Sequence, residues 1–118
     1  MTTPVKNFGD YIVTFEAEPE VDVRMRTHFI KECGWTERQY RKIKDCAWFS
    51  AKVSIWKAGK ELATEYLGCC CYTTEEEFYT TYEGAYFADM VRTCANEIND
   101  PVLTQTVDAW HDAFRTTT

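Results

Sequence analysis

Cysteine has the widest choice of chemistry in this sequence, because a thiolate can bind a metal, attack a substrate or form a disulfide. The chain has six cysteines: Cys33, Cys46, Cys69, Cys70, Cys71 and Cys94. No pair has the two-residue gap usual for zinc ligands, and in a strand Cys70 would point away from its two neighbours. A disulfide framework needs an oxidising compartment. We therefore favour reduced cysteines that pack as small apolar side chains; a metal site and disulfide or redox chemistry are the alternatives.

Histidine is the usual general base of enzymes, and the chain has two, His28 and His111. His111 follows Asp108 by three residues, which resembles the orienting pair of a catalytic histidine, but the spacing favours the exposed polar side of a helix. No phosphate-binding glycine loop, metalloprotease helix or serine elbow occurs. The sequence predicts a protein that is not an enzyme and has no cofactor; a Cys–His pair that is distant in sequence is the alternative.

The charges are divided unevenly along the chain. Residues 61–118 carry 11 acids and two bases, Arg92 and Arg115, whereas residues 1–60 carry 8 acids and 11 bases. The formal charge is therefore −9 in the second half and +3 in the first, within a net charge of −6. This asymmetry predicts a bipolar surface whose acidic side meets a basic partner, although acids also keep small proteins soluble.

Regularly spaced carboxylates on a rigid frame can imitate the phosphates of DNA. Residues two apart on a strand face the same way at a distance of about 6.7 Å, and three glutamates near the end of the first predicted strand have this spacing. For the Glu75–Glu77 run, stabilising the start of a helix is the alternative explanation. We predict that a partner contacts ten acids: Glu16, Glu18, Glu20, Asp22, Glu75, Glu76, Glu77, Glu83, Asp89 and Glu97.

A basic stretch offers a different function. Arg38, Arg41, Lys42 and Lys44 fall in one predicted helix, and basic helices can contact phosphates. The net acidity of the chain and the lack of an aromatic RNA-binding motif favour a solvated helix face instead. We therefore expect no nucleic-acid binding and keep such a domain as an alternative.

The elements that position these residues follow from apolar periodicity and from capping residues. In chain order, the patterns predict a strand over 10–17, a helix over 22–33, a helix with a capping box at Thr36 and Gln39, strands over 47–57 and 61–72 joined at Ala58–Gly59, a helix capped by Thr74, a helix over 85–98, and a last helix that begins at Asp100–Pro101. Residues 1–9 lack such a pattern, and we expect a loose lead-in there. The sequence thus predicts a single α+β domain, residues 1–118, with a three-stranded antiparallel sheet and the order β-α-α-β-β-α-α.

One face of the predicted hairpin carries two tryptophans, Trp48 and Trp56. We expect the C-terminal helices to cover this face; a binding partner is the alternative.

The length of 118 residues suits one domain, and 45% apolar residues are enough to form a core. No apolar stretch is long enough to span a membrane, and no secretory signal is recognisable at the start. We therefore expect no membrane partner.

The run FGDYIVTFEA at residues 8–17, followed by Asp22 just ahead of a helix, resembles the start of small phage-encoded type I-F anti-CRISPR proteins. The resemblance covers about the first half of the chain. It implies an inhibitor in the cytoplasm of a bacterial host, which binds a Cascade surveillance complex where that complex reads the duplex of the protospacer-adjacent motif. The resemblance also implies that Asp22 is one of the residues that contact this complex. The chain departs from the family at Arg24, Arg26 and Lys31, which make the first helix basic.

Overall fold

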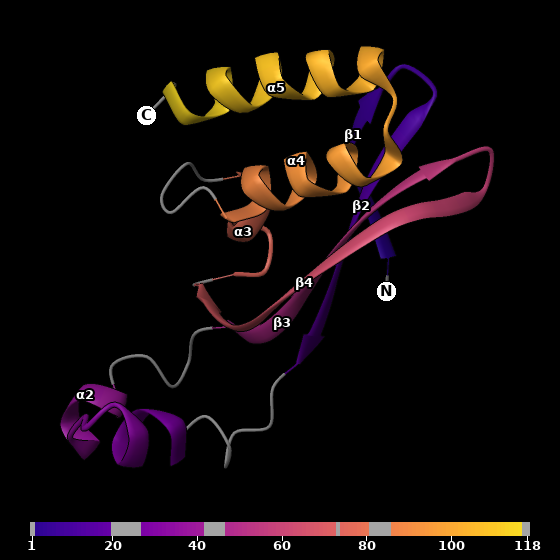
Figure 1. Ribbon diagram of the computed structural model, residues 1–118. Helices are drawn as coiled ribbons and strands as arrows, with labels where there is room; N and C mark the ends of the chain where they lie inside the picture. Colours follow the sequence, from indigo (N-terminus) through magenta and orange to yellow (C-terminus); the bar gives the residue numbers. More distant parts are fainter. Residues whose placement is uncertain (1, 20–26, 42–46, 73, 81–85, 117–118) are drawn as a thin grey trace.

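The computed structural model describes residues 2–19, 27–41, 47–72, 74–80 and 86–116. Its framework is a four-stranded antiparallel sheet in the order β1-β2-β3-β4 (Figure 1). The α+β class and the antiparallel sheet agree with the prediction, but the predicted number of three strands is wrong. The chain begins with a further strand, so the predicted element order is wrong. The three helices expected after the central hairpin are present among the described residues, although the order β-α-α-β-β-α-α counted only two.

The additional strand, β1 (Thr2–Phe8), lies where we expected a loose lead-in. It forms a hairpin with β2 (Tyr11–Pro19), and the turn depends on Gly9, whose φ of 61° is one that other residues rarely adopt. Most β1 side chains are exposed, and the register shifts just after Pro4. An edge strand of this kind lacks the apolar alternation by which strands are recognised in a sequence.

The central hairpin agrees with the prediction. It consists of β3 (Ala47–Lys57) and β4 (Lys60–Tyr72), joined by a two-residue turn at Ala58 and Gly59. Both turn residues have positive φ angles, 51° and 76°, as a type I′ turn requires.

A bulge in this hairpin decides which side chains share a face. Lys57 pairs with Lys60 across the turn, but the register shifts by one residue between Ile55 and Trp56. As a result, Lys52 lies opposite Tyr66. Because a shift of one residue exchanges the two faces of a strand, the bulge moves Tyr66 to the face that carries Lys52.

In the described parts of the segment between β2 and β3 there are two short helices: η1 (His28–Glu32), a π-helical turn, and α2 (Glu37–Arg41). Of the helix predicted over 22–33, residues 27–33 fall among the described residues. The predicted capping box is confirmed, because the amide of Thr36 donates to Gln39 Oε1 at 2.9 Å and the amide of Gln39 donates to Thr36 Oγ1 at 3.2 Å.

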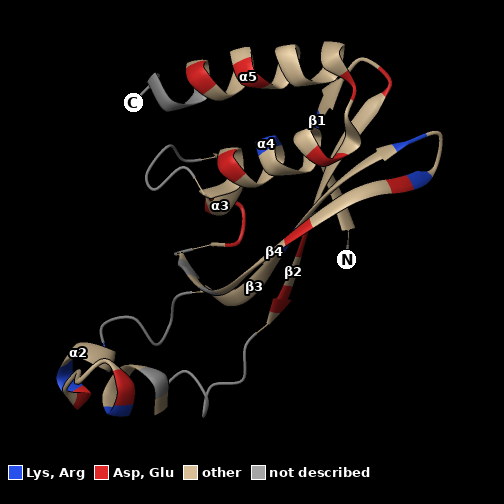
Figure 2. Ribbon diagram, in the orientation of Figure 1, with Lys and Arg blue, Asp and Glu red and all other residues tan. Residues whose placement is uncertain are grey.

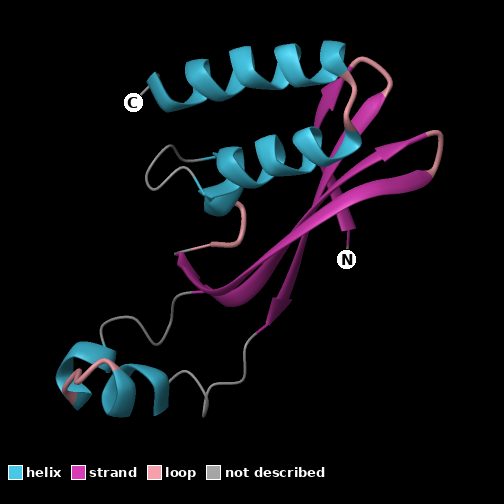
Figure 3. Cartoon of the chain, in the orientation of Figure 1, coloured by secondary structure: helices cyan, strands magenta, loops and turns pink. Residues whose placement is uncertain are grey.

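Three helices follow the hairpin and are drawn in cyan beside the sheet in Figure 3: α3 (Glu77–Thr80), α4 (Tyr86–Ile98) and α5 (Pro101–Thr116). The first begins three residues after its predicted cap, Thr74, whose carbonyl accepts from the amide of Glu77 at 3.3 Å. The start of α5 is as predicted. The Asp100 carboxylate accepts hydrogen bonds from the amides two and three residues later, at 3.0 and 3.4 Å.

The core lies between the sheet and these helices. Alternate strand residues supply its sheet side, and the apolar stripes of α4 and α5 supply its helix side. Its fully enclosed side chains include Val13, Phe49, Val53, Ile55, Val91, Cys94 and Val107.

The two hairpin tryptophans lie on the other face, so the prediction that the C-terminal helices cover them is wrong. Trp48 is buried instead by η1, with its ring centroid 4.6 Å from that of Phe29. Trp56 is half-buried, and its indole N–H donates to Thr14 Oγ1 of β2 at 2.9 Å. The alternation of β3 was predicted correctly, but the helices pack on the Phe49 side because that side is the more continuously apolar.

Candidate functional site

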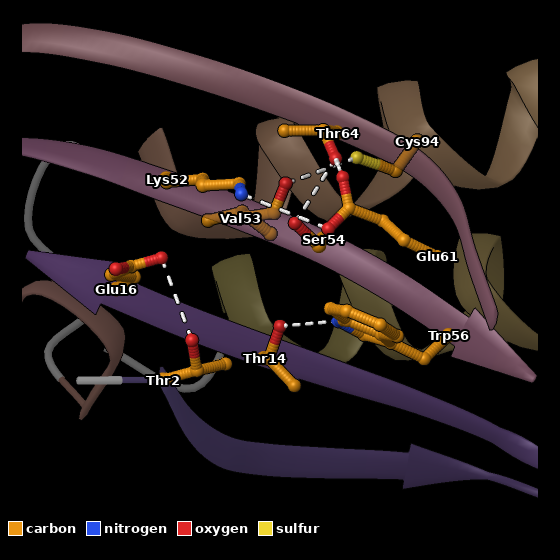
Figure 4. Close-up of polar contacts among 10 residues, drawn as sticks. All are labelled: Thr2, Thr14, Glu16, Lys52, Val53, Ser54, Trp56, Glu61, Thr64 and Cys94. Atoms are coloured by element: carbon orange, nitrogen blue, oxygen red, sulfur yellow. Dashed lines mark hydrogen bonds and ion pairs between the residues drawn. The ribbon is translucent and has the colours of Figure 1, made fainter. Parts of the chain in front are cut away.

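The described helices α3–α5 leave one face of the sheet uncovered, and we call its side chains the open face. They stand in rows across β2, β3 and β4, and the helices lie behind the sheet in the view of Figure 4. The rows are Ile12–Trp56–Glu61, Thr14–Ser54–Thr64, Glu16–Lys52–Tyr66 and Glu18–Ser50.

Polar side chains on the open face hold one another in place (Figure 4). The hydroxyls of Ser54 and Thr64 are hydrogen-bonded at 3.1 Å, and Thr64 donates in turn to Glu61 Oε1. The second carboxylate oxygen of Glu61 lies 3.7 Å from Lys52 Nζ. The ammonium group of Lys52 is therefore directed toward β4 by an ion pair.

Beside this network the open face has a hollow of about 330 Å³, lined by Glu16, Ala17, Glu18, Pro19, Ser50, Lys52 and Tyr66. Its depth follows from small residues, since Ser50 is short and its neighbour Gly68 has no side chain to fill the space. The Tyr66 side chain stands at one side and is 70% exposed. The sequence analysis missed Tyr66, because its face depends on a bulge that no apolar pattern marks.

The predicted partner-binding acids are distributed over both faces of the sheet. Glu16 and Glu18 belong to the open face. Glu75 and Glu76 lie on the opposite side, in a second hollow of about 270 Å³ that they share with Phe15 and Tyr79. Burial, together with these two carboxylates, raises the pKa of the Tyr79 hydroxyl. The two groups of acids therefore face different directions.

Glu77 is the first residue of α3, which agrees with a role at a helix start. Glu20, Asp22 and Glu83 fall outside the described residues.

Asp89 makes a contact that the sequence analysis did not anticipate. Its Oδ1 lies 2.6 Å from Nε2 of His111, which joins α4 to α5. The His111 side chain is 3% exposed, so the prediction of a histidine on the exposed side of the helix is wrong. Asp108 is the partner that the spacing suggested, but its Oδ1 lies 3.8 Å from Nε of Arg92 instead. The apolar stripe of α5 indicated which side of this helix is buried. His111 belongs to that buried side only because of the position of α4.

Glu97 lies near a buried thiol. It is hydrogen-bonded to Glu65 of β4, and this bond with burial raises the pKa of the Glu65 carboxyl. Burial and the nearby carboxylates raise the pKa of Cys94 to about 12. Cys94 is therefore a protonated thiol at neutral pH, and it donates a weak hydrogen bond to the Val53 carbonyl at 3.6 Å.

Three cysteine side chains are described, and they test whether the cysteines pack as apolar side chains, bind a metal or form disulfides. Cys70 and Cys94 are buried, as packing requires, whereas Cys33 is exposed, and none of these three described cysteines forms a disulfide. The side chains of Cys69 and Cys71 and all of Cys46 fall outside the described residues. Within the described parts of the chain, no three His, Cys, Asp or Glu side chains are grouped to hold a metal.

The charge division of the sequence is visible in Figure 2. Lysine and arginine occur together with acids in the η1–α2 region and at the tip of the β3–β4 hairpin, whereas α3, α4 and α5 carry mainly acids. The bases of α2, Arg38 and Arg41, are exposed, and Lys42 and Lys44 lie outside the described residues.

Comparisons with known proteins gave no match: no protein-family model, no curated protein and no solved structure is similar to this chain. Of the helices among the described residues, none has the length and apolar character needed to cross a membrane.

Proposed function

We propose that the protein is a non-enzymatic acidic inhibitor, which occupies the basic DNA-binding surface of a bacterial type I CRISPR-Cas complex, Cascade. The observation that carries the proposal is the excess of acids in residues 61–118, which hold 11 acids and two bases; five of these acids lie on α3–α5: Glu77, Asp89, Glu97, Asp108 and Asp112. Such a surface attracts a basic groove over a long distance and accelerates association at low salt. The resemblance of residues 8–17 to type I-F anti-CRISPR proteins suggests the partner.

Long-range attraction and direct contact have different requirements. All acids contribute to the electrostatic field of the protein, but only the acids on one face can touch a given partner surface. Glu16 and Glu18 lie on the open face of a rigid sheet, which makes them the best placed of the predicted acids for contact. Glu75, Glu76, Asp89 and Glu97 then act mainly through the field.

The test is binding of a labelled target duplex by purified Cascade at saturating inhibitor, with a parallel pull-down. We expect the duplex to be excluded. Normal DNA binding in the presence of bound protein would contradict DNA competition and point to blocked nuclease recruitment. Absence of the protein from the pull-down would contradict the proposal as a whole.

A matched pair of double variants separates contact from field. Glu16→Lys with Glu18→Lys changes the open face, and Glu75→Lys with Glu76→Lys makes the same change in charge on the other side. We expect the first pair to weaken inhibition mainly through faster dissociation. The second pair should slow association and leave dissociation unchanged.

A further inference from the structure

The hollow on the open face combines two kinds of binding surface in a small space. Glu16 and Glu18 contribute carboxylates from β2, and Tyr66 contributes a largely exposed aromatic ring from β4. Among the described residues that line it, Lys52 is the one cation, and its ammonium group is directed toward Glu61 of β4. The hollow therefore has an acidic wall on β2 and an aromatic wall on β4, with Lys52 and the short side chain of Ser50 between them on β3.

Arginine matches this combination better than any other natural side chain. Its guanidinium group is flat, stacks on aromatic rings, and donates parallel hydrogen bonds to carboxylates. Lysine has a compact, strongly hydrated ammonium group that gains less from a ring face. A nucleic-acid phosphate would be repelled by Glu16, Glu18 and Glu61.

We propose that this hollow binds an arginine side chain of a basic protein partner, with the guanidinium group between Tyr66 and the carboxylates of Glu16 and Glu18. The inference rests on the proposed function, because it names the contact by which the acidic protein holds its partner. The complementarity is one of charge and of shape. The open face supplies both from side chains that the sheet holds in place.

The binding test uses two short peptides, acetyl-(Gly-Arg)₃-amide and acetyl-(Gly-Lys)₃-amide, which have the same charge. Each is titrated into ¹⁵N-labelled protein at low salt, where surface electrostatics are least screened. We expect the arginine peptide to bind about threefold to tenfold more tightly. Its largest chemical-shift changes should fall on the amides of residues 16–18, 50–52 and 66. Equal affinity for the two peptides, or shifts confined to α3–α5, would overturn the proposal.

The tyrosine and glutamate variants in the hollow each have a matched control elsewhere. Tyr66→Ala should weaken arginine-peptide binding about threefold to tenfold. Tyr86→Ala, which removes a tyrosine that is 53% exposed on α4, should leave it unchanged. Likewise Glu18→Gln should weaken binding and Glu76→Gln should not. Ser50→Leu fills the hollow without changing charge and should abolish the preference for arginine. Thermal melts confirm that each variant is folded, and equal effects of Tyr66→Ala and Tyr86→Ala would also overturn the proposal.

Three further outcomes are decisive. If the same resonances move on concentrating the protein without peptide, the hollow binds a second copy of this chain and the proposal is wrong. If Cascade is not bound but the arginine peptide is, the proposed function fails and the hollow remains an arginine site. If the Tyr66→Ala and Ser50→Leu variants each inhibit Cascade as well as the wild-type protein does, the proposed function stands and the arginine contact fails.

Discussion

The hydroxyl of Tyr11 donates a hydrogen bond to Asp100 Oδ2 at 2.6 Å, which ties the start of β2 to the start of α5 across 89 residues of chain. The other oxygen of the same carboxylate caps α5. One carboxylate therefore fixes both the first turn of the last helix and its position beside the sheet.

Replacing this carboxylate should destabilise the protein in a pH-dependent way. We expect Asp100→Ala to lower the Tm by about 5 °C at pH 7. The hydrogen bonds from Tyr11 and from the Leu103 amide lower the pKa of Asp100. The stabilisation is thus present above the ordinary pKa of an aspartate and is lost as the pH falls through the lowered value. Melts from pH 7 to pH 2 should therefore converge for the wild type and Asp100→Ala; a constant difference would contradict this.

The Asp89–His111 pair should matter far more than an exposed ion pair of the same helices. Asp89→Ala leaves the buried imidazole without its partner, and we expect a loss of about 1–3 kcal/mol in the free energy of unfolding. Asp108→Ala, which removes the exposed partner of Arg92, is the matched control and should cost less than about 0.5 kcal/mol. Urea denaturation measures both. Similar costs for the two variants would show that the buried contact is unimportant.

The carboxyl pair of Glu65 and Glu97 predicts the opposite dependence on pH. Because Glu97 raises the pKa of Glu65, the contribution of Glu65 to stability is present below its unfolded pKa and lost as the pH rises through the folded value. Glu65→Gln supplies a permanent donor to Glu97. We expect it to increase the urea midpoint at pH 7 and to have little effect at pH 3. A lower midpoint at pH 7 would contradict the shared-proton arrangement.

The contact between Phe29 and Trp48 predicts a local effect. Phe29 lies 4.6 Å from Trp48 and 4.5 Å from Trp35 between ring centroids, outside the main core. We expect Phe29→Ala to increase hydrogen exchange of residues 37–41 at least tenfold, with little change in β3. Phe49→Ala, which removes a fully buried core ring, should instead cost about 3–5 kcal/mol and expose all elements together. Hydrogen exchange measured by mass spectrometry distinguishes the two patterns.

Local signals predicted much of the fold. The turn at Ala58–Gly59, the Thr36 capping box and the Asp100 cap depend on residues within three positions of one another, so the sequence contains the whole interaction. The strand before Gly9 has no such signal. It is stabilised by pairing with β2, a partner chosen by the tertiary structure.

The candidate site was less predictable for the same reason. Alternation placed Glu16, Glu18, Ser50 and Lys52 on strand faces. Counting back from the turn, however, pairs Lys52 with Glu65, and only the bulge brings Tyr66 to that position. The burial of His111 likewise depends on Asp89, 22 residues earlier, and not on its neighbours in the chain.

The edge strand β4 affects how the protein behaves at high concentration. An unpaired strand edge is a template on which identical chains can stack into fibrils. Here Glu61 and Glu65 lie along that edge, so two copies that approach edge to edge would bring like charges together. We therefore expect concentrated solutions to stay free of fibrils at neutral pH, and acidification, which removes this repulsion, to be the condition that starts their growth.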